Sequence, residues 1–449
     1  MAQRRNTAQQ PRLAQSLECN CCLPSNSQQA AVNIGPKARI HLVHTHFCAA
    51  VVGHDSASIL DHFPLAPYYP SAIGKSCANA SDIYCDSERM GQAVFTNTEL
   101  TKRLTNGASV RLSGRLTDSI GAGQDKELQV ESVEILGECD PETYPMQKHA
   151  LSVEYLRDHC HLRTRTREIA AMMRLRDSVS TAMQSYFQSQ GFCYVHTPIL
   201  TSNDCEGAGE TFKIAPSSPP SILTSEAKPA EYFGHPAYLT VSSQLHLEAL
   251  ATAISRVYTL SPCFRAERSQ TNRHLAEFWM LEAEWAFTSG LDDICQVVED
   301  LLKHSLNKNL DTMGILWQGG DQSKWLALQN IAQSDPRWTR ISYDQAVKEL
   351  TRYQAVTKEF VFEPAWGKSL QSEHERWIAE KLVNGPVFVT DYPAELKPFY
   401  MRLNDDGKTV ACFDLLIPHL GELVGGSLRE ERHGLLEGAL ERHNLGKED

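Results

Sequence analysis

The sequence has no run of about 18 uninterrupted apolar residues, the length that a membrane-spanning helix needs. It also lacks a CxxC…CxxC pattern, and its 13 cysteines, an odd number, are scattered from Cys19 to Cys412. That distribution argues against a disulfide framework and favours a reducing compartment. Nor is there an excess of positive charge: 43 Lys and Arg stand against 55 Asp and Glu, a net charge of −12. We therefore expect no membrane span and no histone-like polycation, although local basic patches remain possible nucleic-acid contacts.

Acidic residues are also missing from the first part of the chain, where none precedes Glu18. Arg4, Arg5 and Arg12 lie there among Gln, Asn, Thr and Ser, a composition typical of an organellar transit peptide. A disordered polar terminus explains the same residues equally well. We expect residues 1–35 to be one or the other; a transit peptide would direct the protein to the mitochondrial matrix, and a cytoplasmic location is the alternative.

The chain is long enough for two or three domains, since it has 449 residues, 42% of them hydrophobic. Residues 49–95 follow no sustained period of 2 or 3.6, whereas residues 108–138 alternate in the manner of β-strands. The sequence thus predicts a partial, irregular β module over residues 36–139. A stiff Asp-Pro-Glu-Thr-Tyr-Pro segment begins a linker over residues 140–168.

Beyond the linker, residues 169–449 mix helical and strand-like patterns. Apolar residues at intervals of three and four predict a helix over 169–187, with Gly191 as its stop signal. Pro198 places the strand-like segment 192–200 at a sheet edge. Further helices are predicted over 244–255 and from Ser289 toward His304, and strands over 386–391, 399–403 and 409–416, the last two joined by a turn at 404–408. This arrangement predicts an α+β domain.

The most informative stretch is a predicted hairpin that carries Arg265 and Glu267 on one strand and Arg273 and His274 at its tip. Side chains two apart on a strand share a face, so the guanidinium and the carboxylate lie together. An arginine on a rigid strand suits a phosphate through its bidentate fork, and a nearby carboxylate can accept from an exocyclic amine. The alternative is an ordinary charged hairpin with surface ion pairs.

The segment that contains this hairpin, FRAERSQTNRHLAEFWMLEAEW, resembles the second signature motif of the class II aminoacyl-tRNA synthetases. Upstream, GFCYVHTPIL resembles their first motif, whose helix and strand form the homodimer interface. The resemblance runs from about Leu104 to the C-terminus, and the block FYMRLNDDGKTVACFDLLIPHLGELVGGSLREER is most similar to the asparaginyl group. It implies an antiparallel sheet flanked by helices, preceded by a partial OB-fold-like anticodon-binding module.

The resemblance also implies an activity and a site. The activity is that of an asparagine–tRNA ligase, which uses ATP and Mg²⁺ to form asparaginyl-adenylate and transfers asparagine to tRNA(Asn), as a homodimer. Arg265 and Glu422 would be catalytic. The implied ATP contacts are Arg265, Ala266, Glu267, Arg273, His274, Leu275 and Glu422, the amino-acid contacts are Glu206, Gln244, Leu245, His246, Leu247, Arg265, Gly425 and Arg429, and the Mg²⁺ ligands are Glu422 and Asp414. The chemistry agrees: the substrate carboxylate is already a nucleophile, so catalysis comes from alignment and from positive charge.

Asparagine is favoured over aspartate by one local feature. In the related aspartyl enzymes a lysine stands where this sequence has Leu247, so the cation that would pair with a substrate β-carboxylate is missing. A buried, unpaired carboxylate is costly, and a neutral carboxamide fits better. Ordinary helix packing of Leu247 is the alternative explanation. An aspartate-charging relative therefore stays open at this point.

Two departures from the family pattern bear on activity. Only the last strands of the OB-fold, over residues 104–138, are recognisable, and the sequence stops at Asp449 without a third motif. We expect from this a truncated chain with weak or no aminoacylation activity, since one phosphate cation and one core strand would be missing. A non-catalytic fragment that binds tRNA or dimerises is a further alternative. The basic run from Arg157 to Arg176 could contact tRNA phosphates or form a solvated helix face.

Overall fold

The computed structural model divides into two compact units, Met1–Leu65 with Gly74–Glu142, and Ala66–Ile73 with Thr143–Asp449. The division at Glu142 falls within the segment predicted as the start of a linker. None of the helices in the described part of the chain is long and apolar enough to cross a membrane. The structure describes residues 39–43, 50–51, 80–84, 90–102, 104–119, 126–146, 151–202, 211–215, 231–267, 275–316, 322–333 and 337–442.

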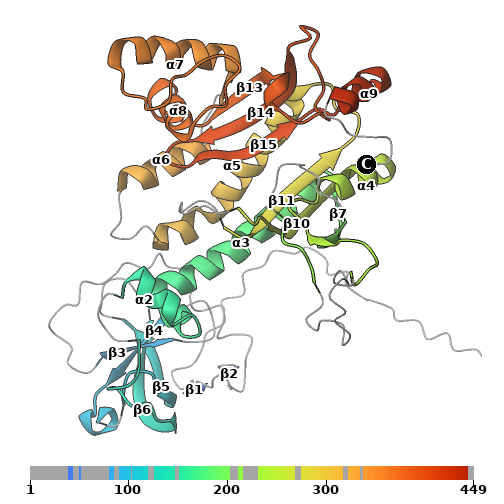
Figure 1. The fold of residues 1–449 in the computed structure, drawn as a ribbon. Helices are drawn as coiled ribbons and strands as arrows, with labels where there is room; N and C mark the ends of the chain where they lie inside the picture. Colours follow the sequence, from blue (N-terminus) through green and yellow to red (C-terminus); the bar gives the residue numbers. More distant parts are fainter. Residues whose placement is uncertain are drawn as a thin grey trace, which may run out of the picture. The chain divides into compact units, whose positions relative to one another are not determined.

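The first unit is a six-stranded sheet with the order β2-β1-β5-β6-β4-β3 (Figure 1). Its centre is the long antiparallel pair β5 and β6. Among the side chains that the structure describes, the buried apolar core of this sheet consists of Ala93, Phe95, Leu112, Leu128 and Val130. The elements are β1 (Arg39–Val43), β2 (Ala50–Val51), β3 (Ala80–Tyr84), β4 (Met90–Phe95), a 3₁₀ turn η1 (Thr98–Thr101), β5 (Ser109–Asp118) and β6 (Lys126–Gly137).

Three of these strands, β2 to β4, lie within residues 49–95, where the sequence showed no strand pattern. Two outer pairs, β1–β2 and β3–β4, join the central pair through long-range contacts: β1 pairs antiparallel with β5, and β4 pairs parallel with β6. The register of the β5–β6 ladder shifts between Ser113 and Gly114. A glycine is needed there, because a Cβ at position 114 would lie 2.0 Å from the Gln129 carbonyl oxygen. Such long-range pairing leaves little trace in local alternation.

The second unit begins with helices and a three-stranded sheet of order β11-β10-β7. Antiparallel β10 and β11 form a nine-residue ladder, and β7 adds two residues at the edge, parallel to β10. The aromatic residues Tyr186, Phe187, Phe192 and Tyr258 pack this sheet against α3 and α5. The elements are α2 (Val153–Asp158), η2 (Arg163–Arg165), α3 (Arg167–Ser189), β7 (Cys193–Tyr194), β8 (Leu200–Thr201), β9 (Tyr238–Leu239), α4 (Gln244–Ile254), β10 (Arg256–Phe264), β11 (Glu277–Trp285) and α5 (Leu291–Leu316).

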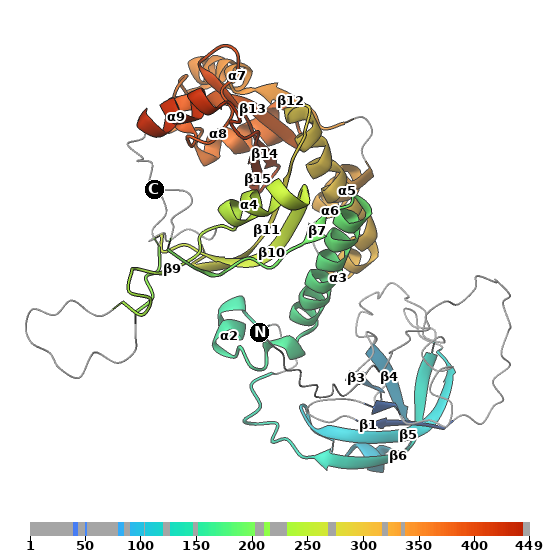
Figure 2. The same cartoon turned by 90° about the vertical axis from the view of Figure 1, so that its right-hand side faces the viewer.

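A second sheet, of order β12-β13-β14-β15, completes this unit and is covered on both faces (Figures 1 and 2). Alternation along β13 explains the two cores: Val387 and Val389 pack with α7, while Phe388 packs with α5. The elements are α6 (Gln322–Gln333), β12 (Thr339–Ser342), α7 (Tyr343–Thr357), α8 (Ser372–Trp377), the π-turn η3 (Ile378–Leu382), β13 (Val387–Pro393), η4 (Ala394–Leu396), β14 (Thr409–Ile417), β15 (Gly421–Ser427) and α9 (His433–Arg442).

The predicted α+β class is confirmed, and most predicted helices lie within two or three residues of their observed starts. The predicted strand over 399–403 is wrong, since this segment makes only isolated bridges, from Met401 to Arg429 and from Leu403 to Val410. The preceding Pro398 and the turn at residues 404–408 leave too little extended chain for a continuous ladder. The turn itself is present, and Asn404 N–H donates to the Thr409 carbonyl at 2.8 Å.

A buried carboxylate joins α5 to the start of β12. Glu299 is fully buried, and its Oε1 accepts from Lys303 Nζ at 2.6 Å and from the Trp338 backbone N–H at 3.2 Å. We expect Glu299→Ala to lower the free energy of unfolding by about 3 kcal/mol, because both donors lose their buried partner. Urea unfolding measures this. Asp300→Ala is the matched control on the same helix, since its pair with Arg337 is exposed and is worth less than about 1 kcal/mol; equal losses in the two variants would contradict the prediction.

Candidate active site

Arg265 lies at the end of β10, where the β10–β11 ladder closes. Its backbone N–H donates to the Ala276 carbonyl at 3.1 Å, and its guanidinium lies 5.6 Å from the centre of the Phe278 ring. The prediction that Arg265 and Glu267 lie on one strand is wrong, because β10 ends at Phe264 and both residues follow it; the half-buried Arg265 side chain extends from the end of the β10–β11 pair. Ala266 and Glu267 follow directly, and the Glu267 residue is exposed.

Three predicted site residues, Glu206, Arg273 and His274, lie outside the described residues. Leu275 is the last of the predicted nucleotide contacts on the hairpin. Its side chain is 62% exposed, and it lies two residues before the start of β11. The described part of this hairpin thus provides one fixed cation, Arg265, together with an exposed apolar side chain.

The N-terminus of α4 is held by a carboxylate from β11. Glu282 accepts from the Ser243 backbone N–H at 2.8 Å and from the Ser242 hydroxyl. Burial raises the pKa of Glu282, while these hydrogen bonds and the charge of Arg265 oppose that shift. A carboxylate at a helix N-terminus is favourable because it accepts from otherwise unpaired N–H groups. This contact fixes the position of α4 beside Arg265.

The predicted amino-acid contacts on α4 differ in how deeply they are buried. Leu247 is only 1% exposed and packs with Ala251 and Val257, so the helix-packing explanation of this residue is the one that the structure supports. Gln244, the first residue of the helix, is half-buried, and its Oε1 accepts from the Tyr400 hydroxyl at 3.2 Å. No acceptor for the buried Gln244 Nε2 is found among the described residues. Leu245 is exposed, and His246 is half-buried.

Arg429 forms the strongest ion pair of this region with a residue that the sequence did not single out. Arg429 Nε and Nη2 donate to the two carboxylate oxygens of Glu284 at 3.0 and 2.9 Å. The Tyr400 ring lies 4.6 Å from the guanidinium, and Glu248 Oε2 is 3.8 Å away. Burial lowers the pKa of Arg429, but the bond to Glu284 and the neighbouring carboxylates raise it further. Arg429 therefore keeps its charge and is held side by side with Glu284 by two hydrogen bonds.

Sequence reasoning missed Glu284, Glu248 and Tyr400. Glu284 is two residues beyond Glu282 on β11, so both carboxylates share one face of that strand. The alternation along EFWMLEAEW was the signal that could have identified it. Its partner is 145 residues away, which no local pattern discloses.

On the second sheet, Asp414 and Gly425 are directly paired between β14 and β15, and Glu422 lies near them. A Cβ at Gly425 would lie 3.2 Å from Glu422 Oε1 and 3.7 Å from Asp414 Oδ1. Both carboxyl groups therefore border the space that the glycine leaves open. Loss of solvation, and then repulsion by Asp414, raise the pKa of Glu422 to about 7, whereas Lys397 and Arg265 lower it. The direct pair of Glu284 on β11 with Arg429, which follows β15, brings the two sheets together in this region.

Asp414 itself has a cation as its partner. Lys397 Nζ lies 2.9 Å from each carboxylate oxygen of Asp414. Among the described residues, no group of three or more His, Cys, Asp or Glu side chains could hold a metal ion. The donor set therefore fits a magnesium ion held by Glu422 and by oxygens of a bound ligand, rather than a cage made of protein atoms alone.

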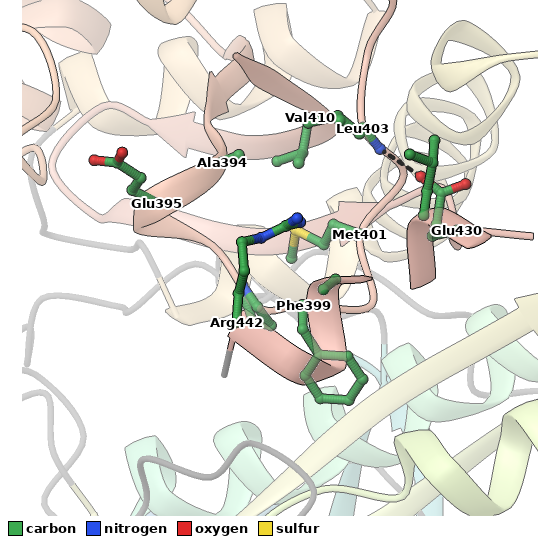
Figure 3. Close-up of a pocket in the computed structure, with 11 residues that line it drawn as sticks. Ala394, Glu395, Phe399, Met401, Leu403, Val410, Glu430 and Arg442 are labelled. Carbon is green, nitrogen blue, oxygen red and sulfur yellow. Dashed lines mark hydrogen bonds between the residues drawn. The ribbon is translucent and has the colours of Figure 1, made fainter. Parts of the chain in front are cut away.

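A separate cavity of about 300 Å³ lies between the segment 394–403 and α9. Figure 3 shows Phe399 and Met401 at this cavity, with Arg442 from the end of α9 beside them. None of the predicted site residues lines it. Tyr400, which contacts Gln244, does not line it either. The cavity is therefore distinct from the contacts described above.

The arrangement has a clear chemical capacity. Arg265 offers a fork for a phosphate, Glu422 offers oxygen to a divalent cation, and the Arg429–Glu284 pair offers one donor edge and one acceptor edge to a small polar group. These features define a site for a nucleotide and a small polar substrate at the junction of two antiparallel sheets.

Comparison with known proteins places this fold and site in a class. The family model described as tRNA synthetases class II (D, K and N) matches residues 152–449. The chain belongs to this family, as the motif resemblance predicted.

The curated relatives indicate one group within this class. The chain is 46% identical over 355 residues to the asparagine–tRNA ligase of Desulfotalea psychrophila, covering 78% of this chain and 76% of the relative, and 45% identical over 358 residues to that of Nostoc sp., with the same coverage. The crystal structure of asparaginyl-tRNA synthetase from Pyrococcus horikoshii complexed with asparaginyl-adenylate is similar with a TM-score of 0.67 at 30% identity, covering 82% of this chain and 80% of that one. Within the class, the chain thus belongs with the asparagine–tRNA ligases.

Proposed function

We propose that the protein joins asparagine to tRNA(Asn) in two steps, through asparaginyl-adenylate made from asparagine and ATP. The observation that carries the choice of amino acid is the bidentate pair of Arg429 and Glu284. Relatives named asparagine–tRNA ligase, 45–46% identical over 78% of the chain, support the same activity.

The pair matches a carboxamide because that group has one acceptor, its oxygen, and a nitrogen that donates. Arg429 would donate to the carboxamide oxygen, and Glu284 would accept from its nitrogen. A substrate carboxylate would instead face Glu284, with Glu248 3.8 Å from Arg429 as a second negative charge. Like charges in a half-buried site are costly, so aspartate is disfavoured. This argument replaces the one based on Leu247, which is part of the core.

In the first step, an α-carboxylate oxygen of asparagine attacks the α-phosphorus of ATP. A new phosphorus–oxygen bond forms, the bond from the α-phosphorus to the bridging oxygen breaks, and pyrophosphate leaves with the electron pair. Arg265 would donate to the α-phosphate oxygens, where negative charge grows in the transition state. The rigid β10–β11 ladder holds this cation in place, which reduces the cost of alignment.

Magnesium is part of the proposal as a cofactor that Glu422 would hold together with phosphate oxygens of ATP. When bound, it would supply positive charge to those oxygens. Glu422 must be ionised to serve as a ligand. Burial and the neighbouring Asp414 raise the pKa of this carboxyl group, and a bound cation would favour its ionised form.

The remaining parts of the proposal concern partners and place in the cell. We propose a homodimer formed through the segment of α3, β7 and β8, where Met172, Tyr194 and Leu200 are exposed. Contacts to tRNA phosphates would come from the basic run that includes Arg163 and Arg165 of η2. A mitochondrial matrix location rests on the composition of residues 1–35, with the cytoplasm as the alternative.

Exchange of labelled pyrophosphate into ATP tests the proposed activity. We expect exchange that depends on asparagine, with a kcat/KM for aspartate lower by a factor of at least about 10³, because the site pairs with a carboxamide. Equal exchange with aspartate would identify an aspartate-charging enzyme. If neither amino acid supports exchange and ATP with asparagine gives no thermal shift, the protein is a non-catalytic member of the family.

A further inference from the structure

The pair of Lys397 and Asp414 is the least expected feature of the site. Lys397 follows η4 directly, and its ammonium group lies 2.9 Å from both carboxylate oxygens of Asp414. The ring of Tyr392 lies 4.1 Å from the same nitrogen. The Lys397 side chain is 18% exposed and that of Asp414 is 13% exposed. This is a half-enclosed ion pair with an aromatic face beside it, which is a better fixed contact than a surface pair.

The neighbourhood explains why a cation is needed there. Asp414 and Glu422 both border the space at Gly425. Two carboxylates this close repel each other, and partial burial strengthens the repulsion. The ammonium group of Lys397 neutralises one of them. In the protein without nucleotide, Lys397 supplies the positive charge that a metal ion supplies in sites with two unpaired carboxylates.

A divalent cation meets two obstacles at Asp414. Magnesium binds oxygen ligands at about 2.0–2.1 Å, and both oxygens of Asp414 already accept from Lys397. An ion placed between Asp414 and Glu422 would also lie close to the positive charge of Lys397, and that repulsion is strong where water is partly excluded. The oxygens of Glu422 are more accessible to a cation than those of Asp414, since no contact of Lys397 with them is found among the described residues.

We propose that Lys397 is a positioning residue whose ammonium group occupies the position at Asp414 where a metal ion would otherwise bind. Asp414 is then not a metal ligand, and divalent-cation binding depends on Glu422 together with the phosphates of ATP. The proposal deepens the function proposed above and rests on it for the identity of the nucleotide. Its consequence is an order of events: the free protein binds divalent cations weakly, and the metal enters with ATP. Removal of Lys397 would create a two-carboxylate metal site that works without nucleotide.

The test is a titration of the nucleotide-free protein with Mn²⁺, followed by electron paramagnetic resonance, in which free Mn²⁺ is counted directly. Mn²⁺ prefers the same oxygen ligands as Mg²⁺. We expect Lys397→Met to bind Mn²⁺ about tenfold more tightly than the unmodified protein, because one more carboxylate becomes available and one positive charge is lost. Unchanged or weaker binding in Lys397→Met overturns the proposal.

Further variants show whether the effect passes through Asp414. In the Lys397→Met background, Asp414→Asn should return the Mn²⁺ affinity to that of the unmodified protein; a double variant that still binds tightly contradicts the proposal. Asp414→Asn alone should leave Mn²⁺ affinity unchanged, and a loss would show that Asp414 is already a ligand. Lys408→Met is the matched control, since Lys408 is exposed in the turn at residues 404–408.

These measurements remain informative if a variant folds poorly or if the proposed function fails. Asp414→Asn keeps the shape of the side chain, so it tests the proposal even where Lys397→Met leaves two repelling carboxylates and unfolds. No ATP, asparagine or tRNA is present in the titration. A protein without exchange activity that behaves as expected here would refute the proposed function alone, and an active protein with unchanged Mn²⁺ affinity would refute the role of Lys397 alone.

Discussion

Replacing Arg265 with alanine is expected to lower kcat of asparagine-dependent pyrophosphate exchange by about 10²–10³, the effect typical of losing one fixed charge donor to a transition state. The guanidinium is held on the end of β10 by the strand ladder and lies against Phe278. Charge on the α-phosphate oxygens grows as the adenylate bond forms. The variant should therefore lose rate more than it loses affinity for asparagine, and steady-state kinetics separates the two.

Two further variants make this result specific. Arg265→Lys keeps the charge without the planar fork and should recover only part of the rate. Arg256→Ala is the matched control, because Arg256 lies at the opposite end of the same strand and donates to the Gln190 carbonyl at 3.3 Å. A kcat for Arg265→Ala within threefold of the unmodified enzyme, or an equal loss in Arg256→Ala, would remove Arg265 from the reaction.

Local patterns in the sequence predicted those parts of the site that local structure fixes. The hairpin that carries Arg265 was predicted, although Arg265 lies one residue beyond the end of its first strand, and the predicted helix from Gln244 begins at that residue. Leu247 shows the limit of residue-by-residue comparison. Its spacing from Ala251 is one helical turn, and both are buried against Val257, so the phase of the helix turns this side chain into the core.

The parts that escaped prediction depend on contacts between distant segments. The role of Glu284 becomes visible only in the folded protein, where it pairs with Arg429, 145 residues further along the chain. Lys397 reaches Asp414 because the β13–β14 pair and η4 bring the two together across 17 residues. The strands β1 and β4 join the first unit's sheet by pairing with β5 and β6, which lie far along the chain. In each case tertiary pairing overrides weak local preference.

Replacing Glu284 with glutamine is expected to produce the largest change in substrate choice. The variant keeps the size of the side chain but removes the negative charge that accepts from Arg429 and, in the proposed complex, from the carboxamide nitrogen of asparagine. We expect kcat/KM for asparagine in pyrophosphate exchange to fall by about 10²–10³, since a site built around hydrogen bonds loses most when a buried partner is left unpaired. The ratio of asparagine to aspartate activity should fall as well, because repulsion of a substrate carboxylate is relieved.

Glu248→Gln separates this effect from a general change of charge near Arg429. Glu248 lies 3.8 Å from the guanidinium and makes no bidentate contact with it, so its replacement should change kcat/KM for asparagine less than about tenfold. If Glu284→Gln retained the preference for asparagine, or if Glu248→Gln lost it equally, the acceptor for the carboxamide would have to be another group. Gln244 would then be the first to examine, since its amide borders the same space beside Tyr400. The two glutamate variants therefore decide whether selection depends on one matched donor–acceptor pair or on the summed charge around Arg429.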